Sequence, residues 1–187
     1  MVDSYITLRG MVLEISDQKL QKLVLYFLDN PGFKEAVCSP YHHTYNGGLS
    51  DHVLEVAQMS LGIYDSCVKK DLLSRDFLIA GAMLHDVGKL YMDIEEYRNA
   101  GVSHAIIGAY VVSEACCTLN IPNDTRKLLM SLIVEHSKYG LGKHVKFSTR
   151  EAYIVLAADG LSAAVCSTDN TSEETKALWD EIQVVNI

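Results

Sequence analysis

Apolar residues recur at helical spacing along nearly the whole chain, and this pattern constrains the fold more than any other feature of the sequence. Between Ser16 and Pro31, five of them fall at positions i, i+3, i+4, i+7 and i+8, which form one face of a helix. These residues are Leu20, Leu23, Val24, Phe27 and Leu28. Strand-like alternation is not sustained for more than a few residues, apart from a weak indication over residues 5–12. The sequence therefore predicts a single all-α domain.

Residues that favour helix N-termini divide the rest of the chain into further helices. The expected helix over residues 77–88 is apolar on nearly every face, which predicts a central position in the fold. Gly108 would let another backbone approach its helix closely, and Gly140 is expected to end the following helix. Residues 148–151 (Ser-Thr-Arg-Glu) have the form of a capping box. The expected capping residues are Ser50, Ser74 or Asp76, Ser103, Asp124, Ser148 and Ser172.

The length of the chain indicates how many domains it forms, and its net charge indicates which partners it can bind. A chain of 187 residues fits one domain with a sizeable core. We expect an N-terminal extension over residues 1–14, the domain over 15–170, and a C-terminal helix over 171–187 that packs on the domain or on a second copy in a homo-oligomer. With 24 acidic and 16 basic side chains, the net charge is -8, which argues against a general surface for long nucleic acid. A small local phosphate site stays compatible with this charge.

The cysteines and the N-terminal segment indicate the compartment. Five cysteines are an odd number, and no pair has the C-x-x-C spacing of a zinc site, which favours free thiols in a reducing compartment. The N-terminus lacks a basic segment followed by an apolar one. The longest apolar stretch, residues 77–84, is far shorter than the roughly 20 residues of a membrane-spanning helix. We therefore expect a cytoplasmic protein without a membrane segment.

Polar residues interrupt the apolar helices at three places. His85 and Asp86 follow one apolar run, Asp159 follows another, and His52 lies among apolar residues of a third expected helix. A buried carboxylate needs a cation or strong donors as its partner, because leaving it unpaired costs several kcal/mol. Each group also has a purely structural interpretation: a core histidine beside a helix-terminal aspartate, a carboxylate bonded to a helix end or an arginine, and a packed imidazole.

Taken together, these residues form a set of two imidazoles and two carboxylates that three helices contribute. Such ligands suit Mn²⁺, Fe²⁺ or Zn²⁺ better than an ion that prefers thiolates. Their order along the chain resembles the H…HD…D signature of the HD-domain metal-dependent phosphohydrolases.

Two longer blocks sharpen this resemblance. Residues 42–52 (HHTYNGGLSDH) are similar to the HH-x-x-x-GGL-x-x-H block of one branch of the family, and residues 80–89 (AGAMLHDVGK) are similar to its LLHD-[IV]-GK block. This branch includes the HD domain of bacterial 3′–5′ exoribonucleases and relatives in mobile-element proteins. The resemblance covers about residues 15–170 and implies a helical HD domain with its metal site between the central helices.

The resemblance also implies a second metal site. His104 and His136 are at positions where two-metal members of the family have histidines, and Asp86 would be the carboxylate that bridges two ions. Some members have a further histidine directly after the second of these, where this chain has Ser137. The implied cofactors are one or two divalent ions per chain, chosen from Mn, Fe, Mg, Ni and Zn. By themselves, His136 would also suit the negative end of a helix dipole, and His104 a solvated first turn.

Three residues near the ligands are candidates for contact with substrate. Lys89, four residues after His85, is expected to neutralise a phosphate or to assist the leaving oxygen, although a lysine also stabilises a helix C-terminus. His43 and the glycine turn that ends at Gly48 would line the pocket, because backbone N–H groups of such turns bind phosphate. A plain turn is equally consistent with these glycines. Asp86 and Lys89 are the expected catalytic residues.

The activity that the resemblance implies is hydrolysis of a phosphoester bond in a small nucleotide or short oligonucleotide by a metal-activated hydroxide. An exonuclease is less favoured, because the exoribonuclease relatives carry an additional OB-type nucleic-acid domain and at most a dozen residues precede the first helix here. Two other classes stay open: a diiron oxygenase, which some HD-fold proteins are, and a non-catalytic module that binds a nucleotide or metal. The intact ligand set with Lys89 argues against the module, whereas the ligands barely separate an oxygenase from a hydrolase.

Overall fold

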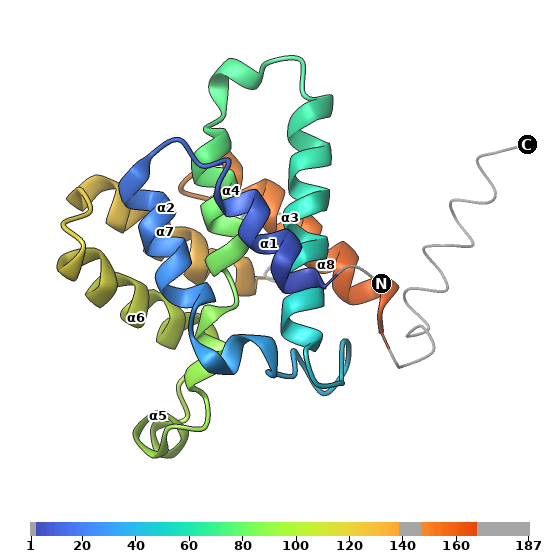
Figure 1. Ribbon diagram of the computed structural model, residues 1–187, viewed down its shortest axis with the longest axis vertical. Coiled ribbons are helices and arrows are strands. Elements are labelled where there is room, and N and C mark those ends of the chain that lie inside the picture. Colours follow the sequence, from blue (N-terminus) through green and yellow to red (C-terminus); the bar gives the residue numbers. More distant parts are fainter. Residues whose placement is uncertain (1–2, 139–146, 168–187) are drawn as a thin grey trace, which may run out of the picture.

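The computed structural model of the protein describes residues 3–138 and 147–167, and these residues form the all-α fold that the sequence predicts (Figure 1). The α-helices are α1 (Ser4–Val12), α2 (Gln18–Leu28), α3 (Gly48–Ser66), α4 (Arg75–Leu84), α5 (Glu95–Ala100), α6 (His104–Thr118), α7 (Asn123–Glu135) and α8 (Arg150–Val165). The 3₁₀ segments are η1 (Pro31–Lys34), η2 (Lys70–Leu72), η3 (Val87–Tyr91) and η4 (His136–Lys138). Within the described residues there is no β-strand, and an isolated antiparallel bridge joins His42 to Ser167.

Three helices form the centre of the molecule. α4 contacts both α3 and α8, which also pack on each other. α1 and α2 cover these helices on one side, while α6 and α7 pair on another and α5 projects away from the body (Figure 1). Every residue from Phe77 to Leu84 in α4 is buried, which confirms the central position that its apolar faces predict.

The N-terminal segment is helical, so the weak strand indication over residues 5–12 is wrong. Leu8, Met11 and Val12 are buried at positions i, i+3 and i+4 of α1, and Asp3 caps the helix. Only a helix places these three apolar side chains on one face, and this burial outweighs a short alternating pattern. The described part of the expected extension therefore contributes a helix to the core.

Two of the predicted helix starts are confirmed. The hydroxyl of Ser74 accepts a hydrogen bond from the first turn of α4, and Ser103 directly precedes α6. Asp76, the alternative cap for α4, instead accepts hydrogen bonds from Ser16 and from the N–H of Asp17. Its carboxylate thereby ties the start of α4 to the start of α2.

Two other predicted starts are wrong by a few residues. α3 begins at Gly48, so Ser50 lies inside the helix, where its hydroxyl donates a hydrogen bond to the Phe33 carbonyl. α7 begins directly after Pro122, so Asp124 lies in the first turn instead of preceding the helix. In both cases the residue still lies near the N-terminus of its helix, where the negative charge of Asp124 is favourable.

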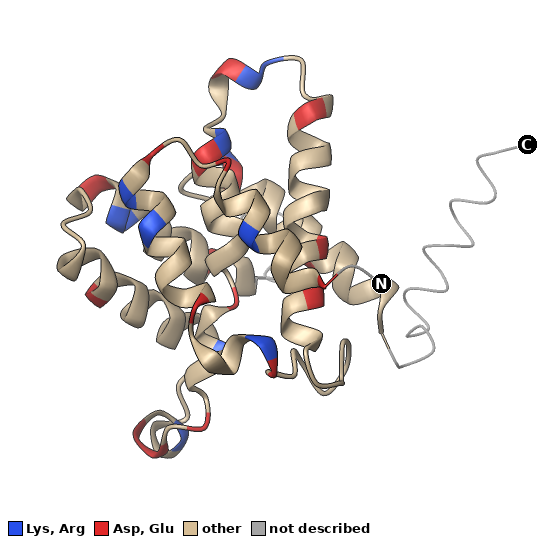
Figure 2. Ribbon diagram, viewed as in Figure 1, with Lys and Arg blue, Asp and Glu red and all other residues tan. Residues whose placement is uncertain are grey.

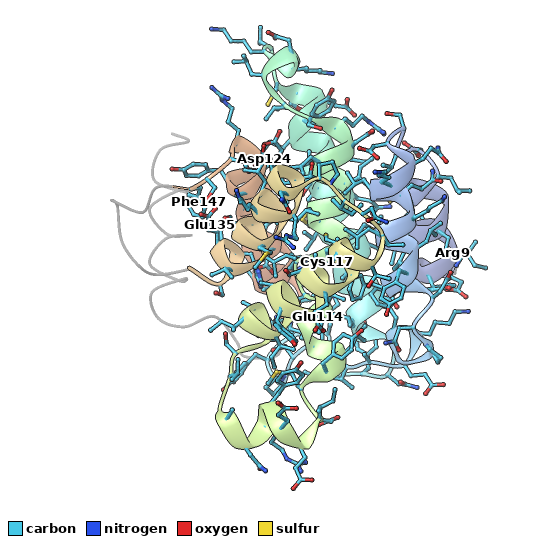
Figure 3. The ribbon with its side chains drawn as sticks, turned by 90° about the vertical axis from the view of Figure 1, so that its left-hand side faces the viewer. Arg9, Glu114, Cys117, Asp124, Glu135 and Phe147 are labelled. Atoms are coloured by element: carbon cyan, nitrogen blue, oxygen red, sulfur yellow. The ribbon has the colours of Figure 1, made fainter. Side chains whose placement is uncertain are left out.

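α8 begins one residue later than the capping-box pattern predicts. Thr149 caps the helix, because Ser148 uses its hydroxyl and its N–H to bind the carboxylate of Glu135 at the end of α7. Glu151 accepts a hydrogen bond from the backbone at the start of α4 rather than from its own cap. Glu135 and Phe147, labelled in Figure 3, mark the place where α7 meets the segment before α8.

α4 ends earlier than expected, and this break brings the next segment against α6. The last residue of α4 is Leu84, and Asp86 adopts φ -105° and ψ 8° before the chain continues as η3. A Cβ on Gly88 would meet the carbonyl oxygen of His104 at 1.9 Å, so only glycine permits this contact between η3 and α6. Gly108 on α6 faces Gly88 in this contact, which agrees with the expectation that Gly108 lets another backbone approach its helix closely.

Two further expectations fall outside the described residues, namely the helix end at Gly140 and the C-terminal helix after Ser172. All five cysteines are free. None of the helices in the described ranges has the length and apolar character needed to cross a lipid bilayer. Basic residues lie on several elements, with acidic residues close by, instead of forming one basic face in the view of Figure 2.

Candidate metal centre

The six predicted ligands lie together around one buried carboxylate, that of Asp86. They are supplied by α3 (His52), the end of α4 (His85 and Asp86), the start of α6 (His104), the residue after α7 (His136) and α8 (Asp159). His52 and His85 are fully buried, and Asp86 is 2% exposed. The packing of the central helices therefore joins residues from across most of the chain.

One carboxylate oxygen of Asp86, Oδ2, faces the inner group, which we define as His52, His85 and Asp159. The Nε2 atoms of His52 and His85 lie 3.3 and 3.4 Å from Oδ2 and 3.2 Å from each other. Asp159 adds a second carboxylate, whose Oδ1 lies 3.2 Å from His52 Nε2. Two imidazoles and two carboxylates therefore converge on one point.

The other oxygen of Asp86, Oδ1, faces the outer group, which we define as His104 and His136. Their Nε2 atoms lie 3.3 and 3.4 Å from Oδ1 and 3.2 Å from each other. The His136 side chain is buried, whereas that of His104 is 31% exposed. The Asp86 carboxylate thus lies between two sets of imidazole nitrogens.

In three of these four histidines, the opposite ring nitrogen is held by an acceptor. Nδ1 of His85 lies 2.7 Å, and Nδ1 of His136 lies 2.5 Å, from a carbonyl oxygen in the preceding helical turn. A carbonyl oxygen only accepts, so both Nδ1 atoms donate to it and the Nε2 atoms of the two rings are turned toward Asp86. Nδ1 of His52 lies 3.0 Å from the hydroxyl oxygen of Ser162.

This donor set fits a divalent metal ion. Imidazole nitrogens and carboxylate oxygens gather here at 3.2–3.4 Å from one another, and a cation among them would be attracted by the carboxylates and bound by the nitrogens. Imidazole and carboxylate are the ligands that Mn²⁺, Fe²⁺ and Zn²⁺ accept, and a metal-binding histidine typically donates its other N–H to a neighbouring acceptor. Both groups therefore have the chemistry of ion sites.

The charges around Asp86 favour its ionised form. Burial raises the pKa of Asp86, but the Lys89 ammonium and His85 outweigh this effect and hold the pKa well below its ordinary value. Lys89 Nζ lies 2.5 Å from Oδ2, and the charge of Asp86 raises the lysine pKa although burial lowers it. Burial also lowers the pKa of His52, yet Asp159 and Asp86 raise it overall. The inner group therefore attracts positive charge, whether a proton or an ion.

A cavity of about 820 Å³ opens onto this centre. Asp86 and Asp159, the two outer histidines and Lys89 line it, so both ligand groups reach the same space. Among the described lining residues Lys89 is the sole lysine or arginine, and much of the remaining wall is small or apolar.

Two residues that the sequence reasoning missed also line the cavity. The ring centroid of His42 lies 5.0 Å from that of His52, and burial lowers the pKa of His42 to about 4, so this imidazole is neutral. Cys38 Sγ accepts a hydrogen bond from Lys89 Nζ at 3.2 Å, and burial raises the pKa of this thiol to about 12. The pair of adjacent histidines at 42–43 could have indicated that His42 lines the site. The apolar sequence before Cys38 gives no indication that this residue does.

Two of the three predicted substrate contacts lie outside the cavity lining. His43 is buried with its Nε2 3.3 Å from Oε2 of Glu55, away from Asp86. Gly48 packs against His43, where a Cβ would meet the His43 carbonyl oxygen at 2.1 Å. Its N–H already donates to the Tyr45 carbonyl, so Gly48 offers no free phosphate donor and instead permits a close turn.

These features define a class of protein: an all-α domain whose central helices surround a histidine and aspartate centre at the base of a cavity. The sequence model of the family described as HD domain matches residues 49–164, which is more than half of the chain and includes all six candidate ligands. The protein belongs to the HD domain family.

Curated relatives are similar over most of this chain. It is 30% identical over 166 residues to the dihydroneopterin 2′,3′-cyclic phosphate phosphodiesterase of Methanocaldococcus jannaschii, covering 78% of this chain and 64% of that protein. It is 26% identical over 181 residues to the 3′-5′ exoribonuclease YhaM of a Geobacillus species, covering 88% and 53%. With YhaM of Bacillus subtilis, the identity is 26% over 186 residues, covering 91% and 56%. The chain thus spans less than two thirds of the length of these relatives, and no solved structure matches it.

Proposed function

We propose that the protein is a metal-dependent phosphohydrolase that cleaves a phosphoester bond in a small nucleotide, a nucleotide-like molecule or a short oligonucleotide. The observation that carries this proposal is the arrangement of four histidine Nε2 atoms around the two oxygens of Asp86, each at 3.3–3.4 Å. Divalent cations among these ligands would be attracted by the Asp86 carboxylate and bound by the imidazole nitrogens. Membership of the HD domain family and the enzymatic names of the relatives support the same activity.

The ligand groups suggest two ions that share Asp86. The inner group with Asp86 would hold one ion, and the outer group with Asp86 would hold the other. When bound, divalent ions supply a hydroxide nucleophile near neutral pH and polarise a phosphoryl oxygen. The chain itself fixes the direction of the Nε2 lone pairs, because acceptors hold the Nδ1 protons of His52, His85 and His136.

Lys89 would supply a fixed positive charge to the substrate. Its side chain lines the cavity next to Oδ2 of Asp86, within reach of a phosphoryl oxygen bound above the centre. Because the charge of Asp86 raises the Lys89 pKa, the ammonium keeps its proton at neutral pH. Lys89 therefore acts as a hydrogen-bond donor and counter-charge.

The cavity favours a small substrate with a single phosphate group, and a phosphodiester above all. A volume of about 820 Å³ lies in the range of roughly 300–1,000 Å³ that small-molecule sites have. Apart from the proposed ions, the described lining offers one cation to a phosphate, the Lys89 ammonium. Both kinds of relative are named for phosphodiester substrates, a cyclic phosphate in one case and RNA in the other. The net charge of -8 disfavours long nucleic acid.

The direct test is an assay of the metal-reconstituted protein on cyclic nucleotides, nucleoside mono-, di- and triphosphates, and short RNA. We expect hydrolysis of a phosphodiester by the wild type with Mn²⁺ or Fe²⁺, and none above background by Asp86→Ala. Asp124→Ala is the matched control, because its carboxylate is 95% exposed on α7 (labelled in Figure 3) and should leave activity unchanged. A wild type that releases no product with Mn²⁺, Mg²⁺, Ni²⁺ or Fe²⁺ would contradict the proposal, as would activity that survives Asp86→Ala.

A further inference from the structure

A second cluster of metal-binding side chains lies outside the Asp86 centre. We define it as the His43 cluster, formed by His43 before α3, Glu55 on α3 and Cys166 after α8. Its ligand atoms lie within 4.8 Å of one another. Nε2 of His43 is 3.3 Å from Glu55 Oε2, and Cys166 Sγ is 3.7 Å from each oxygen of the same carboxylate.

The imidazole of His43 points into this cluster without a hydrogen bond for Nε2. Its side chain is 1% exposed, and its Nε2 makes no hydrogen bond of acceptable geometry with Glu55 despite their closeness. The other nitrogen, Nδ1, meets Nδ1 of His42 at 3.1 Å. A buried polar atom without a hydrogen bond is rare in proteins, and a nitrogen that faces a carboxylate oxygen in this way is suited to bind a cation together with it.

The local backbone is arranged to hold His43 in this direction. His43 has φ +49°, a left-handed conformation that is uncommon for a residue with a side chain. Gly48 permits it, because any side chain there would collide with the His43 carbonyl oxygen. The bridge between His42 and Ser167 brings Cys166 to the same place. The chain thus maintains an uncommon conformation that turns His43 from the cavity toward Glu55 and Cys166.

We propose that His43, Glu55 and Cys166 bind a zinc ion that is distinct from any ion at Asp86. Imidazole, carboxylate and thiolate are the three ligand types that Zn²⁺ takes. Donor atoms on a tetrahedral zinc are separated by roughly 3.3–3.8 Å, given bond lengths of about 2.0–2.3 Å. The 3.3 and 3.7 Å separations within the cluster match this range. On binding, the Cys166 thiol releases its proton to solvent and the thiolate binds the ion. The Glu55 side chain is 34% exposed, which leaves access for the ion and for a water as the fourth ligand.

A hydrogen-bond chain links this zinc site to the inner group. The Ser162 hydroxyl donates to Glu55 Oε2 at 2.7 Å and accepts from Nδ1 of His52 at 3.0 Å. An ion that fixes Glu55 therefore also fixes Ser162 and the ring orientation of His52. The role of the zinc is to hold α3, α8 and the turn before α3 in register next to His52.

The first test compares cysteine variants loaded with Zn²⁺ or Co²⁺. Cys166→Ser should bind one fewer Zn²⁺ per chain than the wild type, and its Co²⁺ form should lose the thiolate-to-cobalt charge-transfer absorption. Cys38→Ser, whose thiol lies beside Asp86, and Cys117→Ser, whose thiol is exposed on α6, should keep both. Unchanged zinc content and absorption in Cys166→Ser would overturn the proposal, as would loss of the absorption in Cys38→Ser alone.

A second measurement uses the unmodified chain and does not depend on a variant that folds. Zn²⁺ should suppress alkylation of Cys166 by iodoacetamide, read by peptide mass spectrometry, and leave alkylation of Cys117 unaffected. Equal modification of Cys166 with and without Zn²⁺ would overturn the proposal. Neither readout involves phosphate release. A protein without hydrolase activity can therefore still show the zinc site, and a protein with hydrolase activity can lack it.

Discussion

The inner and outer groups of the candidate metal centre share Asp86 but differ in burial and in the number of candidate ligands. The inner group adds a second carboxylate, and its two histidine rings are fully buried, whereas the outer group has two imidazoles, one of them 31% exposed. Electrostatic attraction for a cation grows with ligand charge and with exclusion of water. The inner group should therefore hold its ion more tightly, and the outer group should leave more room for water and substrate.

The two groups also differ in which helices supply their residues. Residues of the inner group come from α3, α4 and α8, which pack as the centre of the molecule, whereas the outer histidines come from the more peripheral pair α6 and α7 (Figure 1). The outer group reaches Asp86 because glycine at position 88 lets η3 lie directly against α6.

Removal of an inner histidine should cost the most activity. His52 Nε2 lies within 3.3 Å of both carboxylates, so His52→Ala removes the ligand that joins them. Several kcal/mol of transition-state stabilisation should be lost, which lowers kcat/KM by about 10³-fold in steady-state assays. Gln58→Ala, an exposed change on the same helix, is the control. A His52→Ala enzyme within tenfold of wild type would contradict the role of the inner group.

Removal of the exposed outer histidine should cost less and should be compensated by metal. In His104→Ala, water can replace the missing nitrogen on the open side of the site, so we expect roughly a 10²-fold loss at low Mn²⁺. Titration with Mn²⁺ should recover much of this activity, and the same titration should not recover His52→Ala. Equal losses of activity in His104→Ala and His52→Ala, with no recovery by Mn²⁺ in either, would contradict a difference between the inner and outer groups.

Lys89 should affect turnover without holding an ion. Lys89→Met removes a donor that lines the cavity, which should lower kcat by about 10²-fold. Metal content should stay the same or rise, because a cation leaves the surroundings of Asp86. Lys70→Met, at a lysine that is 43% exposed, is the matched control. A normal kcat, or a loss of bound ions, would contradict this role for Lys89.

The smallest effect on the site is expected from a change at Ser162, which contacts the inner group only through Nδ1 of His52. Ser162→Ala removes the hydroxyl that accepts from His52 Nδ1, and such changes weaken metal binding by about tenfold or somewhat more. The affinity of the inner ion should fall while the outer ion is unaffected, as measured by competition with a chelating dye. Equal weakening of both ions would show that Ser162 acts on the whole fold.

The helical fold and the meeting of the candidate ligands His52, His85, Asp86 and Asp159 could be predicted from sequence because both depend on burial. Asp86 and Asp159 end long apolar runs, and a carboxylate in such a place requires a partner. His104 and His136 carried no such local signal, and only the resemblance to the HD domain family marked them. Their geometry around Asp86 agrees with that expectation.

Other features could not be predicted, because two neighbouring residues were equally suited to the same role and a distant contact decides which of them takes it. Ser148 and Thr149 are both good caps, and the choice follows from Glu135, a residue on another helix. Likewise, the sequence favoured His43 for the pocket, but its left-handed backbone turns it away and leaves His42 on the cavity wall. Such conformations arise from tertiary contacts that no local pattern records.

The most direct test of the shared Asp86 is the number of Mn²⁺ ions bound per chain, measured by equilibrium dialysis and elemental analysis. Mn²⁺ prefers oxygen and imidazole ligands, so it discriminates against the thiolate of the His43 cluster. We expect two ions in the wild type and one in His136→Ala, with the remaining ion lost in a further His52→Ala change. A wild type that binds a single ion, retained in His136→Ala, would contradict a carboxylate shared between two ions.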